Sequence, residues 1–160
     1  MPFFCGCSSL SGWHLTELLE YSRSLLLPTE HFGFSLEDGV ALCSSSADRT
    51  RPYPFRYRYG NHFLAIACVG WAKTSKGSLY TGQNEAALLS LYVRHGIKMR
   101  RFLMGDYAFV IHDNAKGRLF FATSPNRKIW IGAQKGEFWF SSAPILPHTT
   151  EADIGLYRLR

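Results

Sequence analysis

Cys5, which is followed by Gly6, is the side chain of this sequence best suited to covalent chemistry. A cysteine thiol becomes a strong nucleophile when a base takes its proton, and a cysteine at the first position of a chain can use its own α-amine as that base. Here three residues separate Cys5 from the initiator methionine, so removal of Met1 leaves Pro2 at the terminus. The nitrogen of Cys5 is then an amide, which is not basic. We therefore expect a buried structural cysteine unless a protease trims the first four residues.

The other reactive side chains are scattered along the chain. Cys7, Cys43 and Cys68 lack metal-ligand spacing, so small thiols are favoured over a metal site or a disulfide framework. The histidines and aspartates that could act as acids or bases fall in different predicted elements, where core, surface or turn roles are favoured: His62, His95, His112, Asp106 and Asp113. The sequence therefore predicts no metal and no cofactor.

The formal net charge of +6 raises the question of an acidic partner. Arginines alternate with tyrosine and phenylalanine in Arg49–Tyr59, a pattern that could follow a nucleic-acid backbone and stack on bases. The same alternation is typical of an exposed strand with aromatic residues on one face and solvated arginines on the other. Pro52 and Pro54 fit a loop or an edge strand. We favour the solvated strand and expect no nucleic-acid partner.

These residues must be positioned by a mixed set of helices and strands. Apolar spacing predicts one helix over Leu15–Leu27, stopped by Pro28, and a second that is capped by Thr81 or Asn84 and ends at Gly96. Gly70–Gly82 is predicted to be mostly loop, and the tail after Pro147 to be polar and then faintly helical. Strands are predicted at Phe3–Cys5, Val40–Leu42, Phe63–Val69, Tyr107–Ile111, Leu119–Ala122, Ile129–Ile131 and Phe138–Ser141. This order predicts an α+β fold.

Length and composition bound the class of protein. The 160 residues suit one domain, and an apolar content of 46% favours a folded globular chain. No apolar run approaches the length of a membrane span, and the first residues do not form a secretory signal. We expect a chain without a membrane partner in a reducing cytoplasm, and the oligomeric state is left open.

The strands Tyr107–Ile111 and Leu119–Ala122, joined by a turn at Asp113–Gly117, are predicted to form a hairpin, and this segment resembles a known family. GDYAFVIHD (105–113), followed by GRLFFA (117–122), resembles the amino-terminal, class II glutamine amidotransferase domain of the asparagine-synthetase family. The resemblance implies an Ntn-hydrolase-like αββα sandwich of mostly antiparallel sheets layered with helices, over residues 1–147. Residues 148–160 would be a tail at the start of the family's interdomain linker, and the synthetase domain is absent from this sequence.

The resemblance also assigns site residues, most of them altered. Cys5-Gly6 matches the family's initial Cys-Gly pair, and Ser46 stands where an arginine binds the glutamine carboxylate. Gly70 or Gly77 matches the oxyanion-hole glycine without its asparagine. Asn84, followed by Glu85, stands where an acidic residue takes the substrate's amine.

Because chemical positions are altered, the resemblance favours a degenerate domain like those of lasso-peptide and β-lactam synthetases. Such a domain would be a structural or docking partner for a separately encoded ATP-pyrophosphatase or synthetase half that forms amides. Two alternatives stay open. One is an active glutamine amidohydrolase that uses Cys5 after trimming, and the other is a basic nucleic-acid-binding module that uses Arg49–Tyr59.

Overall fold

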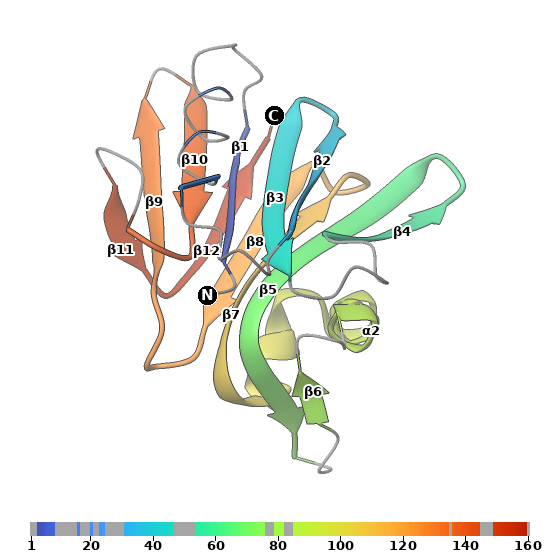
Figure 1. Ribbon diagram of the computed structural model, residues 1–160. Helices are drawn as coiled ribbons and strands as arrows, with labels where there is room; N and C mark the ends of the chain where they lie inside the picture. Colours follow the sequence, from blue (N-terminus) through green and yellow to red (C-terminus); the bar gives the residue numbers. More distant parts are fainter. Residues whose placement is uncertain are drawn as a thin grey trace.

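The chain folds into two antiparallel β-sheets that face each other, with a helix over the outer side of one of them (Figure 1). The computed structural model describes residues 3–8, 16, 20, 23–24, 31–46, 54–75, 79–81, 85–134, 136–144 and 149–159. No helix in these ranges is long and apolar enough to cross a bilayer.

Sheet A has six strands and contains β1 in its interior. In spatial order it consists of β11 (Thr150–Ala152), β9 (Ile129–Gln134), β10 (Glu137–Ser141), β1 (Phe4–Cys7), β3 (Val40–Ser46) and β2 (His31–Glu37). Both neighbours of β1 run antiparallel to it, so Cys5 lies between Ser141 on β10 and Cys43 on β3.

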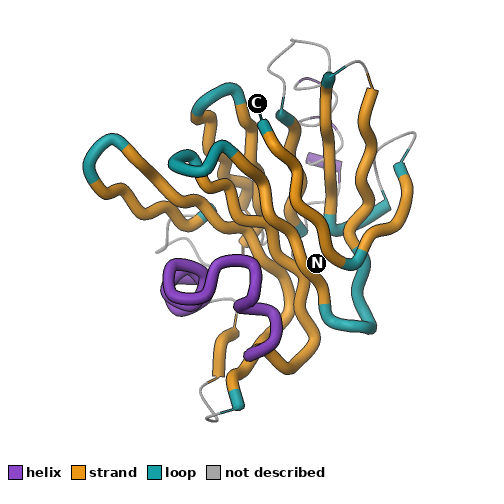
Figure 2. Tube along the Cα trace, turned by 180° about the vertical axis from the view of Figure 1, so that it is seen from behind, coloured by secondary structure: helices purple, strands orange, loops and turns teal. Residues whose placement is uncertain are grey.

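Sheet B is built around the predicted hairpin of strands 107–111 and 119–122. In spatial order it consists of β12 (Ile154–Arg158), β8 (Arg118–Thr123), β7 (Leu103–Asp113), β5 (His62–Thr74) and β4 (Phe55–Tyr59), and the short β6 (Leu79–Thr81) pairs with the end of β5. Helix α2 (Glu85–His95) is followed directly by the 3₁₀-helix η1 (Gly96–Phe102), and both stand out from this sheet in Figure 2. Gly96 ends α2 as predicted, with a φ of 58° that permits the change of direction.

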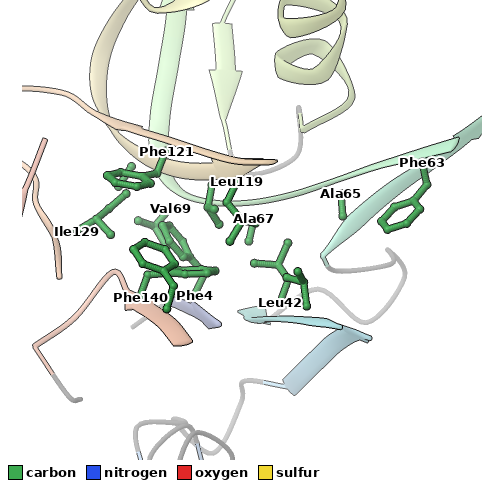
Figure 3. Packing of buried hydrophobic residues seen from close by; sticks show 14 residues of the cluster. Phe4, Leu42, Phe63, Ala65, Ala67, Val69, Leu119, Phe121, Ile129 and Phe140 are labelled. Atoms are coloured by element: carbon green, nitrogen blue, oxygen red, sulfur yellow. The ribbon is translucent and has the colours of Figure 1, made fainter. Parts of the chain in front are cut away.

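Between the sheets lies the inter-sheet core, formed by the inner faces of both (Figure 3). Because side chains alternate along a strand, every second residue of β5 enters this core and the residues between them face outward. Ala65, Ala67 and Val69 face inward, where Phe4, Leu42 and Phe140 meet them from sheet A. On the outer face of sheet B, α2 covers a second core that includes Leu88, Leu89 and Tyr92.

The main predicted elements are confirmed: the hairpin of β7 and β8, the α2 helix, and strands near β1, β3, β5, β9 and β10. The two antiparallel sheets and the helical layer over sheet B agree with the predicted α+β sandwich, although helices are few in the described ranges. Most of the predicted helix Leu15–Leu27 lies outside the described residues. Thr16, Glu20, Arg23 and Ser24 are described within it, and all four are helical and exposed.

Two predictions of local structure are wrong, and one strand was not predicted. Gly70–Gly82 is not mostly loop, because β5 continues to Thr74 against β7 and then turns back into β6. Residues 150–158 are not helical: β11 pairs with β9 and β12 pairs with β8, so this segment joins both sheets. Strand β2, which was not predicted, pairs along its whole length with β3 through the turn at Asp38 and Gly39. In each case the segment becomes a strand because it pairs with another strand, and the local sequence pattern does not encode that pairing.

Candidate functional site

The residues immediately before Cys5 are built into sheet A. The Phe3 amide donates to Ser45 Oγ at 2.9 Å, and the Ser45 amide donates to the Phe3 carbonyl at 2.9 Å. The Phe4 amide donates to Ser142 Oγ at 2.8 Å, and the Ser142 amide returns a bond of 2.8 Å to the Phe4 carbonyl. Phe3 and Phe4 are both buried. Cys5 is therefore an interior residue of a central strand, and its nitrogen is a sheet amide.

The Cys5 side chain lies on the outer face of sheet A. Phe4 packs in the inter-sheet core beside Phe140, with ring centroids 6.5 Å apart, and alternation along β1 turns the next side chain to the other face. There Cys5 is opposite Cys43. A hydrogen bond with Cys5, together with burial, raises the pKa of the Cys43 thiol well above its usual value. Both thiols are fully buried, so neither is accessible to a substrate from solvent.

Gly6 has a packing role, and this role explains the presence of a glycine after Cys5 without any part in catalysis. Gly6 lies opposite Phe140 on β10 and opposite Leu42 on β3. A Cβ at this position would overlap the Ala41 carbonyl oxygen and the Phe140 ring. The aromatic ring of the core thus occupies the space that a side chain would need.

Gly70 lies in the other sheet, within β5 and opposite Tyr107 on β7. Its φ of 82° is in the left-handed region, and a Cβ would overlap the carbonyl of Asp106 on β7. The same Cβ would lie 3.2 Å from the guanidinium carbon of Arg127. Arg127 binds Asp106 through two hydrogen bonds, Nε to Oδ1 at 2.8 Å and Nη2 to Oδ2 at 3.2 Å. The ion pair, next to the half-exposed Trp71, holds the 124–128 loop against β5 and β7.

The remaining predicted site residues come from several elements of both sheets. Ser46 is the last residue of β3 and pairs with His31. Glu85 begins α2 on the outer side of sheet B, where Cys68 Sγ donates to its Oε1 at 3.5 Å. Burial, with Glu85 adding to it, raises the pKa of Cys68 well above its usual value. Gly77 and Asn84 lie outside the described residues. Cys5 is thus on the outer face of sheet A, whereas Gly70 belongs to sheet B and Glu85 to the helix on the outer side of that sheet.

The predicted Arg49–Tyr59 segment is described from residue 54 onward. As predicted, it contains an exposed strand, β4, but Tyr57 and Tyr59 are exposed as well as the arginines. The two tyrosine rings stack at 5.9 Å. Arg58 is already engaged, since it forms an ion pair with Glu37 and lies over the Phe63 ring at 5.5 Å. Arg56, the other arginine of β4, is exposed and forms no ion pair or cation–π contact among the described residues.

The most unusual polar group of the molecule is His112, for which a surface or satisfied core role was expected. Its side chain is on the inner face of β7, 1% exposed, edge-on to Phe63 at 5.0 Å. Among the described residues, its Nε2 has no hydrogen-bond partner, and neither has the buried Ser35 Oγ on β2. Burial lowers the pKa of His112 to about 4, although Asp38, Asp113 and Glu37 act in the opposite direction. A histidine among apolar residues in a strand was the only available signal.

A second buried polar group surrounds Asp113 on the outer face of sheet B. The Tyr92 hydroxyl donates to Asp113 Oδ2 at 2.6 Å, and Arg118 donates to the Tyr92 oxygen through Nε at 3.0 Å and Nη2 at 2.8 Å. The Lys116 amide donates to Asp113 Oδ1 at 3.1 Å. This network fixes α2 and the β7–β8 turn together, which agrees with the turn role predicted for Asp113. Among the described residues, no group of three His, Cys, Asp or Glu side chains is placed to hold a metal ion.

Comparison with known proteins identifies the fold. No protein-family model matches the chain, and no curated protein matches it. The structure is similar to glutamine phosphoribosylpyrophosphate (PRPP) amidotransferase from B. subtilis complexed with ADP and GMP, with a TM-score of 0.67 and 14% identity. It is also similar to the allosteric regulatory enzyme of purine biosynthesis, with a TM-score of 0.54 and 15% identity.

The first match covers 100% of this chain and 49% of the other, and the second covers 98% and 43%. The chain thus spans about half the length of these two structures. The similarity shows the fold of a type 2 glutamine amidotransferase domain, which is an Ntn-hydrolase fold.

Proposed function

We propose that this chain is a glutaminase-like domain of the asparagine-synthetase type that does not hydrolyse glutamine by itself and serves as a structural or docking partner for an ATP-dependent, amide-forming synthetase half. One observation carries the proposal. Cys5 lies inside β1, behind the buried Phe4, with its thiol on the outer face of sheet A. Gly70, the glycine of the matched oxyanion position, belongs to sheet B.

The surroundings of the other matched positions support the same proposal. The bidentate arginine that would bind a substrate carboxylate is replaced by Ser46, which has no charge. Glu85 accepts a hydrogen bond from Cys68 beneath α2. Arg127, which lies beside Gly70, forms a hydrogen-bonded ion pair with Asp106. Each charged group thus has a structural partner within the chain.

Glutamine hydrolysis is the direct test. We expect the purified chain to release no glutamate from glutamine above a Cys5→Ala control, because Cys5 has neither a basic α-amine nor an accessible thiol. Intact mass measured on the same sample establishes whether the terminus precedes Cys5. Glutaminase activity that depends on Cys5 in a chain beginning at Met1 or Pro2 would refute the proposed inactivity.

A variant that lacks residues 1–4, and so begins at Cys5, tests whether a free α-amine restores activity and whether the fold survives the truncation. Trimming removes two buried phenylalanines from sheet A, and loss of one such core side chain costs about 3–5 kcal/mol. We therefore expect a large drop in the denaturation midpoint and no activity. A trimmed chain that keeps its stability and hydrolyses glutamine would favour the amidohydrolase alternative.

The docking role is tested separately with a synthetase half encoded by a neighbouring reading frame. We expect the two purified chains to co-elute, and amide formation by the synthetase half to depend on this chain. An adjacent synthetase half that neither co-elutes with this chain nor depends on it would contradict the docking role while leaving the inactivity intact.

A further inference from the structure

The end of α2 and the 3₁₀-helix η1 carry exposed side chains of two kinds, apolar and basic. Three large apolar side chains face solvent there, Val93 at 66%, Ile97 at 44% and Phe102 at 41% exposure. The basic side chains of Arg94, Lys98 and Arg101 are also exposed. We call these six residues the basic-apolar surface.

The turn between the two helices brings the ends of this segment together. Gly96 takes a left-handed conformation, and the chain folds back so that the Phe102 ring lies 4.3 Å from the His95 ring. Met99 is fully buried under the segment and anchors it to the outer core of sheet B. Because the 3₁₀-helix is anchored in this way, its apolar side chains stay exposed to solvent. Neighbouring exposed apolar side chains often mark a binding surface.

The charge of this surface has one sign. No aspartate or glutamate occurs in the sequence between Glu85 and Asp106. Among the described residues, no carboxylate forms an ion pair with Arg94, Lys98 or Arg101. An occupant that complements the surface must be anionic and must accept apolar side chains.

The shape of the surface favours a flat occupant. In Figure 2 the helix and the 3₁₀-helix project in front of sheet B. Segments that bind bilayers peripherally combine the same two features: apolar side chains enter the headgroup region, and lysine and arginine contact anionic lipids.

We propose that the basic-apolar surface binds the headgroup region of anionic lipid bilayers peripherally. The expectation of no membrane partner rested on the lack of a spanning segment, which has no bearing on binding at the surface. The inference goes beyond the proposed function and does not depend on it.

Co-sedimentation of the full chain with lipid vesicles tests the proposal. We expect binding to phosphatidylcholine vesicles that contain about one-third phosphatidylserine, and little binding to phosphatidylcholine alone. Raised salt should weaken the binding because it screens the lipid charge. Absence of binding to the anionic vesicles at low salt, or equal binding to both compositions, would overturn the proposal.

Matched variants locate the contact. Lys98→Glu with Arg101→Glu should reduce binding more than tenfold, since each cation near an anionic bilayer contributes about fivefold. Arg56→Glu with Arg158→Glu, at exposed strand positions, changes the net charge equally and should leave most of the binding. Ile97→Ser with Phe102→Ser should also weaken binding while the net charge stays the same.

Two results would refute the assignment even if vesicles bind. Equal losses in the two charge-reversal pairs would show that net charge alone is responsible. Binding to an oligonucleotide or to polyglutamate that is stronger than vesicle binding, and is abolished by Lys98→Glu with Arg101→Glu, would assign the surface to another class of partner. Denaturation midpoints of all variants confirm that they are folded.

Discussion

Protonation of His112 should destabilise the fold as the pH falls. The imidazole is 1% exposed in the inter-sheet core, and its burial lowers its pKa from the ordinary 6.5 to about 4. The unfolded chain therefore binds a proton near pH 6.5, whereas the folded chain resists it until about pH 4. Stability from this group is complete above pH 6.5 and is lost as the pH falls toward 4. The difference between the two pKa values corresponds to about 3 kcal/mol.

The structure explains why nearby carboxylates do not prevent this loss. Asp38, Asp113 and Glu37 all favour the protonated imidazole, but burial outweighs them. Glu37 is already paired with Arg58, and Asp38 accepts a hydrogen bond from Asn114. Among the described residues, His112 Nε2 has no acceptor for the added proton.

Urea unfolding between pH 7.5 and pH 4 measures the effect. We expect His112→Leu to remove about 3 kcal/mol of the pH dependence, because leucine keeps an apolar contact in the core and does not titrate. His62→Asn changes an exposed histidine and should keep the steep loss, since His112 is still present. An NMR titration of the His112 ring with a midpoint near 6.5, or parallel pH profiles for wild type and His112→Leu, would refute the reasoning.

Three further substitutions test the packing and the buried polar network. Gly6→Ala should cost about 1–3 kcal/mol of unfolding free energy through overlap with the Phe140 ring, and an unchanged urea midpoint would contradict that role. Gly70→Ala should cost more, because its φ of 82° adds backbone strain to the overlap with Asp106; circular dichroism and the midpoint measure it. Tyr92→Phe should cost about 1–3 kcal/mol by removing a donor from the buried Asp113, whereas Tyr59→Phe at an exposed site should change the midpoint by less than about 0.5 kcal/mol.

The elements that could be predicted are those whose signal is local. The apolar run 107–111, the turn at 113–117 and the return strand predict the hairpin because period and turn residues act within a few positions. The α2 helix is predicted for the same reason, with Gly96 as its end. The errors lie where a distant strand imposes the structure: the end of β5 is ordered by β7, and β11 and β12 by β9 and β8.

The sequence by itself determined that the nitrogen of Cys5 is an amide while residues 1–4 precede it, that Ser46 cannot supply a charge, and that the hairpin around 105–122 follows the pattern of a known fold. These are properties of covalent structure and local periodicity. Only the tertiary structure decided which face of β1 carries the thiol, because the register with β3 and β10 sends Phe4 into the core and Cys5 away from it. It also decided that His112 is buried and that Phe102 is exposed, since burial depends on packing between segments far apart in the chain.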